Sequence, residues 1–241
     1  MMLSLREVEA TAGRFQLGPV SAELGTGVTA LLGANGAGKS TLMKVMVGVL
    51  PARRGSVTVR SGASGEYSRP GYLPQDFDAP RNTPVADYLG FVGWCRASRS
   101  RPVTDEEIHG VLGAVGLSDR ARSPFGRLSG GMRRRVGVAQ AMLGAPAVMV
   151  LDEPTVGLDP VQRSDLRALV VDLARERAVI VSTHLAEDVA AVADRVLILA
   201  DGRQVFAGTT AELAARGGAS TVSSETVERG FLAVVRAEGT P

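Results

Sequence analysis

The sequence predicts an α/β fold, in which helices cover a mainly parallel β-sheet. Residues 28–32, 148–151 and 179–181 form short, continuously apolar runs, which are typical of strands buried on both faces of a parallel sheet. Segments with helical spacing at residues 132–143, 161–176 and 186–193 alternate with these runs. This alternation of strand and helix is the usual order of an α/β domain.

The other predicted elements follow the chain. Residues 3–10 and 15–24 alternate in polarity and predict an antiparallel β part, and residues 57–59 and 71–73 predict further short strands. The run at 28–32 leads into glycines and then into a helix at 40–47, which Gly48 and Pro51 end. Residues 196–199 and 204–206 flank Asp201 and Gly202, a pattern that predicts a hairpin.

The middle of the chain predicts a separate helical lobe. Apolar residues recur at helical spacing in 85–92 and in 106–112, within a stretch that extends over residues 76–127. We therefore expect a single domain over residues 1–241, with an α/β core (1–75 and 128–208), an inserted α-helical lobe (76–127) and a C-terminal tail (209–241). The pattern after about residue 210 is less defined.

Composition excludes several classes of protein. The chain has 241 residues, of which 45% are hydrophobic and 22% charged, as in ordinary globular domains. A net charge of +2 and an aromatic content of 4% argue against a nucleic-acid partner. The one cysteine, Cys95, allows no disulfide within the chain. We find neither a signal-peptide pattern nor an apolar run of membrane-spanning length.

Residues 33–40 read Gly-Ala-Asn-Gly-Ala-Gly-Lys-Ser, which fits the phosphate-loop pattern Gly-x-x-x-x-Gly-Lys-Ser. The glycines let backbone N–H groups close around phosphates, and the helix that begins near Gly38 adds its positive end. We expect Lys39 to reach the β and γ phosphates and Ser40 to bind Mg²⁺. An ordinary glycine turn is the alternative, but a strand before the loop and a helix after it favour a nucleotide. The expected nucleotide-binding residues are Gly33, Asn35, Gly36, Gly38, Lys39, Ser40 and Thr41.

Asp152 and Glu153 follow the apolar run at 148–151. A side chain at the carboxyl end of a parallel strand lies where ligands bind. We expect Asp152 to hold Mg²⁺ through a water molecule and Glu153 to polarise the attacking water. The alternative is a pair of acids that caps the next helix.

Residues 128–132, Leu-Ser-Gly-Gly-Met, open another helix. Ser129 and the amides of Gly130 and Gly131 could bind a γ-phosphate, or Ser129 could simply cap the helix. The three arginines that follow, 133–135, are expected to form a solvated face near the triphosphate rather than a nucleic-acid patch.

Together these three motifs resemble the nucleotide-binding subunit of ATP-binding cassette (ABC) transporters, along almost the whole chain. The resemblance implies a P-loop NTPase (RecA-like) core, ATP and Mg²⁺ as cofactors, and ATP hydrolysis that powers transport through a separate membrane permease. Residues 128–132 would complete the site of a second copy, or of a related cassette, in a head-to-tail dimer. The position would be cytoplasmic, on the inner face of the membrane, and the ending at 227–232 resembles ABC-2 exporters.

The resemblance also implies roles for four residues outside the three motifs. Gln75 would contact Mg²⁺ or the water, and His184 the γ-phosphate. Asp159 would lie in the loop that crosses the dimer. Phe15, the one aromatic before residue 33, would stack on adenine, unless base stacking is weak in this chain.

Two questions stay open at the level of sequence. Tyr88, Phe91 and Trp94 in the lobe could contact the permease or pack within the lobe. A soluble ABC-type ATPase of an assembly process, such as iron–sulfur cluster biogenesis, is the alternative function.

Overall fold

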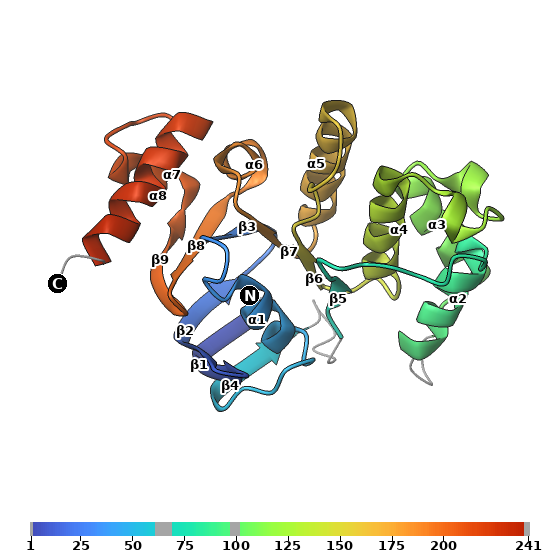
Figure 1. Cartoon of the computed structure of the whole chain (residues 1–241), viewed down its shortest axis with the longest axis horizontal. Helices are drawn as coiled ribbons and strands as arrows, with labels where there is room; N and C mark the ends of the chain where they lie inside the picture. The colour runs from blue at the N-terminus through green and yellow to red at the C-terminus, as the bar shows by residue number, and fades with distance from the viewer. Residues whose placement is uncertain (1, 61–68, 97–101, 239–241) are drawn as a thin grey trace.

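The computed structural model describes residues 2–60, 69–96 and 102–238, and within them it contains two β-sheets (Figure 1). The antiparallel sheet has the order β2-β1-β4, formed by β1 (Leu3–Ala12), β2 (Phe15–Leu24) and β4 (Arg54–Val59). The larger sheet has the order β5-β6-β7-β3-β8-β9. Its strands are β3 (Gly27–Leu32), β5 (Gly71–Leu73), β6 (Val148–Asp152), β7 (Ala178–Thr183), β8 (Arg195–Ala200) and β9 (Arg203–Thr209). The predicted α/β fold is confirmed.

Strands β5, β6, β7, β3 and β8 run parallel, and β9 pairs antiparallel with β8. The helices of the core are α1 (Lys39–Met46), α4 (Gly130–Met142), α5 (Pro160–Ala174) and α6 (Ala186–Val192). The inserted helices are α2 (Val85–Arg96) and α3 (Asp105–Ala114), followed by 3₁₀ turns at Ser118–Arg120 and Phe125–Arg127. Figure 1 shows α2 and α3 at one end of the molecule and the C-terminal helices at the other. Residues 97–101, part of the expected lobe, lie outside the described chain.

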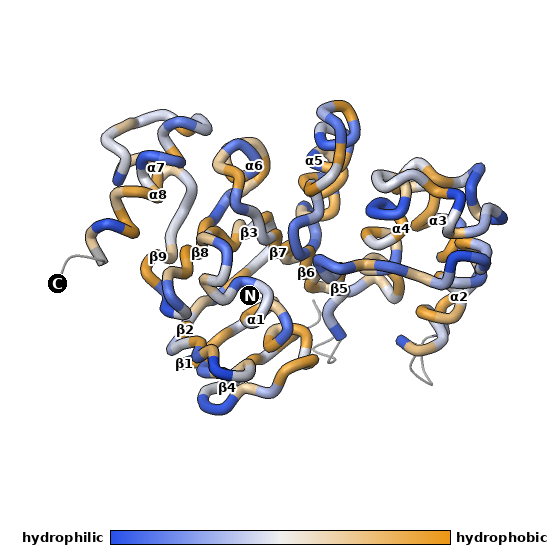
Figure 2. Tube along the Cα trace, in the orientation of Figure 1, coloured by the Kyte–Doolittle hydropathy of each residue, from blue (hydrophilic) through white to orange (hydrophobic). Residues whose placement is uncertain are grey.

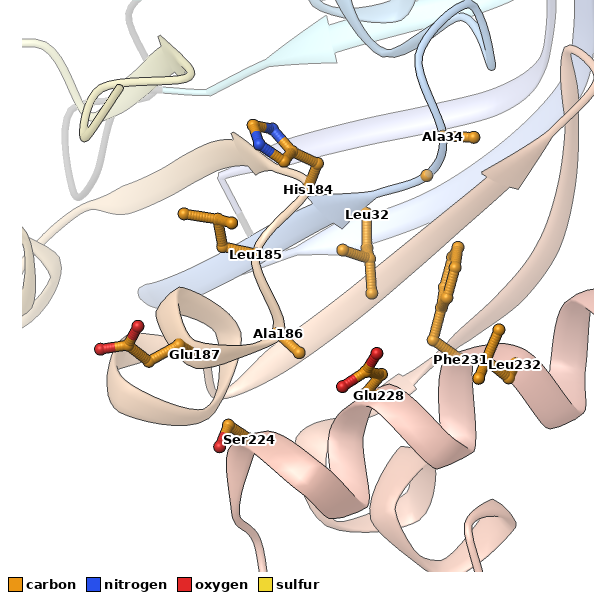
Figure 3. Close-up of a pocket in the computed structure, with 11 residues that line it drawn as sticks. Leu32, Ala34, His184, Leu185, Ala186, Glu187, Ser224, Glu228, Phe231 and Leu232 are labelled. Carbon is orange, nitrogen blue, oxygen red and sulfur yellow. The ribbon is translucent and has the colours of Figure 1, made fainter. Parts of the chain in front are cut away.

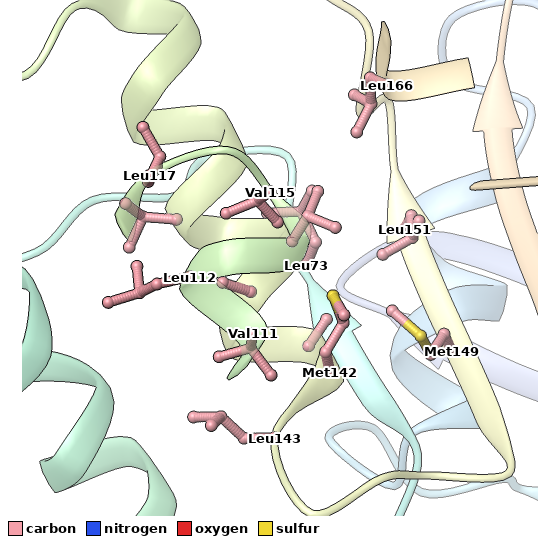
Figure 4. Close-up of a cluster of buried hydrophobic side chains, with 14 of the residues drawn as sticks. Leu73, Val111, Leu112, Val115, Leu117, Met142, Leu143, Met149, Leu151 and Leu166 are labelled. Carbon is pink, nitrogen blue, oxygen red and sulfur yellow. The ribbon is translucent and has the colours of Figure 1, made fainter. Parts of the chain in front are cut away.

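Strand β6 is buried along its whole length because it has packing partners on both faces. Side chains alternate between the faces of a strand. Accordingly, Val148 and Val150 pack with the antiparallel sheet and α1, whereas Met149 and Leu151 pack with the inserted helices. In Figure 4, Met149 and Leu151 of β6 lie on one side of Leu73 and Met142, and Val111 and Leu112 of α3 lie on the other; all six belong to one buried cluster. The lobe therefore shares one hydrophobic core with the strand that ends in Asp152.

Helices α4 and α5 alternate between hydrophilic and hydrophobic segments along the chain (Figure 2), as expected for helices with one buried face. Helix α4 packs against both β5 and β6 as well as against α2 and α3. It is therefore the element that joins the lobe to the sheet.

The segment after residue 209, where the sequence pattern is less defined, forms two helices. They are α7 (Thr210–Arg216) and α8 (Ser224–Glu238), and the sequence analysis predicted neither. A capping box of Thr209 and Glu212 starts α7. Val227 and Val234 of α8 are buried in a core that includes strand residues of β3 and β8. Short helices are stabilised mainly by such tertiary packing, which sequence spacing alone does not reveal.

Candidate nucleotide-binding and hydrolysis site

A cavity of about 600 Å³ lies at the carboxyl ends of the parallel strands. Ligands of α/β proteins bind at this edge of the sheet. The cavity is lined by Ala12, Phe15, Asn35, Gly36, Gly38, Lys39, Ser40, Thr41, Gln75, Glu153 and His184. The structure thus brings together the phosphate loop, Gln75, Glu153, His184 and Phe15, which are far apart in the sequence.

The phosphate loop joins β3 to α1 and depends on glycine. Gly36 and Gly38 have φ values of +83° and +103°, which residues with a Cβ rarely adopt. A Cβ at Gly38 would also lie 2.9 Å from Cζ of Phe15. The loop therefore turns directly into the N-terminus of α1, whose positive end favours an anion.

Lys39 is the first residue of α1 and is buried within the loop. Its Nζ donates hydrogen bonds to the carbonyl oxygens of Gly33 (2.7 Å) and Ala34 (3.0 Å). Burial lowers the pKa of Lys39, and the nearby charges of Glu153 and Asp152 oppose that shift. The ammonium group is thus held among backbone carbonyls at the wall of the cavity.

Ser182, which sequence reasoning missed, connects the two acids at the end of β6. Its hydroxyl donates to Oδ1 of Asp152 and accepts a 2.7 Å hydrogen bond from the amide of Glu153. Glu153 has a φ of +47°, a left-handed conformation that costs a non-glycine residue free energy. This turn directs the two side chains to different places. Glu153 lines the cavity, whereas Asp152 is not among its lining residues.

His184 lies beside Glu153. Its Nδ1 is 3.2 Å from Oε1 of Glu153, so a hydrogen bond joins them when Nδ1 carries the proton. Gln75 is exposed and lines the same cavity. A carboxylate, a histidine and an amide therefore line one cavity beside the phosphate loop.

Asp188 of α6 is a second residue that the sequence analysis missed. Its buried carboxylate accepts hydrogen bonds from Thr155 (2.7 Å) and Thr183 (3.2 Å), and it pairs with Arg167 of α5. Thr155 lies two residues after Glu153, and Thr183 directly precedes His184. Asp188 thus links the side chains of these two threonines, which lie near Glu153 and His184 along the chain, to α6. Its place in the first turn of a helix after a buried strand was the available signal.

Ser129 and Asp159 act as helix caps and are absent from the lining of the cavity. Ser129 accepts a hydrogen bond from the amide of Met132 (3.2 Å), and Asp159 accepts one from the amide of Gln162 (2.9 Å). A Cβ at Gly131 would lie 2.0 Å from the side-chain oxygen of Gln162, so the two capped helix starts adjoin. Gly130 lines a different hollow, on the side of Asp76 and Arg133.

A family model described as "ABC transporter" matches residues 17–156. The chain belongs to the ABC transporter family. It is 36% identical over 185 residues to the uncharacterised ABC transporter ATP-binding protein YxlF of Bacillus subtilis (strain 168), covering 76% of this chain and 62% of that protein. It is 32% identical over 215 residues to the linearmycin resistance ATP-binding protein LnrL of the same organism, covering 86% and 69%.

Other ABC proteins extend these comparisons. The aliphatic sulfonates import ATP-binding protein SsuB 2 of Burkholderia cenocepacia is 36% identical, over 72% of this chain and 63% of that protein. The chain thus spans between three fifths and seven tenths of these three relatives. A solved structure described as an ATP binding subunit of an ABC transporter has a TM-score of 0.80 at 22% identity, over 98% of this chain and 100% of that one. This likeness shows that the fold is that of an ABC ATPase domain.

Beside the candidate site of this ABC protein lies a second cavity of about 420 Å³, which α8 helps to form (Figure 3). Leu32 and Ala34 line it from the strand and loop, and Phe231 and Leu232 line it from α8. His184 borders both cavities. The described helices include none that is both long enough and apolar enough to cross a membrane.

Proposed function

We propose that this chain binds ATP with Mg²⁺ and hydrolyses ATP as the nucleotide-binding subunit of an ABC transporter, with residues 1–241 acting as one such unit. The observation that carries the proposal is the 600 Å³ cavity in which the phosphate loop meets Gln75, Glu153 and His184. A phosphate cradle alone would support binding. The carboxylate within hydrogen-bonding distance of a histidine adds the means to activate water.

Each side chain has a defined part in this proposal. Lys39 and the N-terminus of α1 hold the phosphates, and Thr41 and Asn35 line the same cradle. The carboxylate of Glu153 accepts a hydrogen bond from the attacking water and polarises it, and His184 orients that water and the γ-phosphate. Phe15, which borders the cavity beside Gly38, would stack on the base.

The residues proposed for Mg²⁺ are Ser40 and Gln75, which line the cavity, and Asp152, which does not line it and would act through a bound water. All three offer oxygen atoms, the donors that Mg²⁺ prefers, and one carboxylate with several waters and phosphate oxygens is a usual set for this ion. The described residues contain no cluster of three or more His, Cys, Asp or Glu side chains that could hold a metal. Phosphate oxygens would therefore have to complete the coordination, and the ion would supply charge neutralisation on the phosphates.

Residues 128–132, hereafter the signature segment, support a head-to-tail dimer. Ser129, Gly130 and Gly131 lie at a helix start outside the chain's own cavity. A second copy, or a related cassette, would bring its signature segment to this cavity and take this chain's segment in return. Asp159 adjoins the signature segment through Gln162 and would lie at the same seam.

Phe91 and Trp94 on α2 support a membrane partner. Their side chains are 62% and 76% exposed, and the two rings stack with centroids 6.4 Å apart. Tyr88 instead packs against Phe77 and bonds to Gln140 of α4, so it belongs to the lobe's own packing. We propose that Phe91 and Trp94 dock onto a separate permease on the inner face of the membrane. Transport is favoured over a soluble assembly ATPase because relatives are named as ABC transporter or import ATP-binding proteins. The relatives include both a resistance protein and an import protein, so the proposal of export rests on the likeness of residues 227–232 to ABC-2 exporters.

The test compares the wild-type chain with Glu153→Gln and Lys39→Ala. Loss of the general base is expected to lower the turnover of ATP by about 10²–10⁴-fold. The Glu153→Gln variant should still bind ATP and should accumulate as a dimer in light scattering, because its nucleotide is no longer split. Lys39→Ala should lose ATP affinity in calorimetry. Equal turnover in wild type and Glu153→Gln at saturating ATP would contradict the proposal.

A further inference from the structure

Arg134 lies in the second turn of α4, five residues after the cap Ser129. Its guanidinium donates to five backbone carbonyls. Nη1 bonds to the oxygens of Pro74 (3.2 Å) and Gln75 (2.9 Å), and Nε to that of Pro154 (3.3 Å). Nη2 bonds to the carbonyl oxygens of Asp152 and Glu153. The expectation of a solvated arginine face is therefore wrong for this residue.

These carbonyls belong to the two chain segments that leave β5 and β6. At Glu153 the chain turns through a positive φ, so it leaves the hydrogen-bond ladder of the sheet. Four of the five contacts are partly buried, the one to Gln75 being exposed, and a carbonyl that is shielded from water without a donor is costly. The guanidinium supplies the donors. Burial lowers the pKa of Arg134, and the charges of Asp152, Glu153 and Asp76 oppose that shift. An arginine keeps its charge in such a setting and presents five N–H donors in a rigid fork, whereas a lysine has three on a flexible stem.

We propose that Arg134 is a positioning residue that holds Glu153 and Gln75 in register with the signature segment of the same chain. The inference rests on the proposed function. Because α4 begins at the signature segment, a shift of that segment toward a partner's phosphate carries Arg134 with it. The carbonyls of Gln75 and Glu153 then follow. The residue that activates water at one site is thereby linked to the segment that completes the other site of the dimer.

Arg135 provides a matched comparison within the same helix. It is also half-buried, but it bonds to the carbonyl of Val115 (3.4 Å) and to the carboxylate of Asp165 (3.0 Å). Its partners thus lie on the lobe side and on α5, away from Glu153. Replacing either arginine by methionine keeps most of the side-chain volume and removes the donors.

The experiment measures steady-state ATP hydrolysis of the full chain, wild type, Arg134→Met and Arg135→Met. A displaced catalytic group costs on the order of 10²-fold in rate, so kcat should fall by about 10–100-fold in Arg134→Met. The KM for ATP should stay within about threefold, since the phosphate loop is untouched. Arg135→Met should keep a kcat close to that of the wild type. Equal kcat in the two variants would overturn the inference.

Amide hydrogen exchange gives a second readout that does not depend on hydrolysis. Peptides that contain residues 72–78 and 148–158 should exchange faster in Arg134→Met and not in Arg135→Met. Unchanged exchange in both peptides would overturn the positioning role. If Arg134→Met exchanges faster but the wild-type chain hydrolyses no ATP, the positioning role of Arg134 stands and the proposed function fails. If Arg134→Met does not fold, Arg134→Lys replaces it. Its kcat is expected below that of the wild type and its exchange in the two peptides faster. Wild-type values for both quantities would contradict the inference.

Discussion

Replacing Ser182 by alanine is expected to lower the free energy of unfolding by about 2–4 kcal/mol, because one hydroxyl serves two buried partners. Ser182 is 0% exposed. Its loss leaves the amide of Glu153 without its side-chain acceptor, at about 1–3 kcal/mol for a buried group. It also removes a hydrogen bond to the carboxylate of Asp152, and bonds to charged groups contribute about 1.5–3 kcal/mol. The two terms share one site, so the expected total lies below their sum.

Ser4 is the matched control for this substitution. It is 3% exposed, and its hydroxyl has no hydrogen-bond partner among the residues that the structure describes. Ser4→Ala should therefore change the free energy of unfolding by less than about 0.5 kcal/mol, or increase it, since an unpaired buried hydroxyl is removed.

The assay is urea unfolding of both variants, followed by far-UV circular dichroism without nucleotide. We expect equal m-values and a lower midpoint for Ser182→Ala alone. A Ser182→Ala variant that is as stable as Ser4→Ala would refute the reasoning, because it would mean that neither hydrogen bond stabilises the end of β6.

Three further substitutions test separate parts of the site. Ser129→Arg should prevent ATP-dependent dimers in light scattering and leave ATP affinity of the monomer unchanged; an unaltered dimer fraction would remove the proposed role in trans. Phe15→Ala should weaken ATP binding in calorimetry by about 5–150-fold, the equivalent of about 1–3 kcal/mol of stacking, and an unchanged affinity would leave the base without this contact. Asp188→Ala should cost about 2–4 kcal/mol in urea unfolding because it leaves two threonines without their shared acceptor and Arg167 with the exposed Glu187 as its remaining carboxylate partner. Asp172→Ala, which breaks an exposed pair, is its control and should cost about 0–1 kcal/mol; similar losses in both would speak against the Asp188 network.

The parts of the site that sequence predicted are those that depend on neighbouring residues. Residues 33–38 form the loop between β3 and α1, and the positive φ values at Gly36 and Gly38 are of the kind that a glycine in the sequence allows. Glu153 was recognised because it follows a continuously apolar run. The helix α8 was missed because its apolar face becomes stable only against β3 and β8.

The partners of Ser182, Asp188 and Arg134 could not be predicted in the same way. A serine at the end of a strand and an arginine in a run of three are common patterns with many outcomes. Arg134 reaches Pro74 and Gln75, which precede it by 60 and 59 residues. Nothing in the local spacing tells which of the three arginines turns toward the sheet.

The amino-acid sequence by itself determined the α/β order of elements, the phosphate loop and the acids at the end of β6, since backbone conformation and strand burial follow from adjacent residues. Only the tertiary structure decided which distant groups share hydrogen bonds. The packing of α4 on β5 and β6 selects Arg134 to bind the carbonyls around Glu153, and the packing of α6 on β7 places Asp188 between Thr155 and Thr183. The physical reason is that buried polar groups must find partners within reach, and the partners within reach are set by how the elements pack.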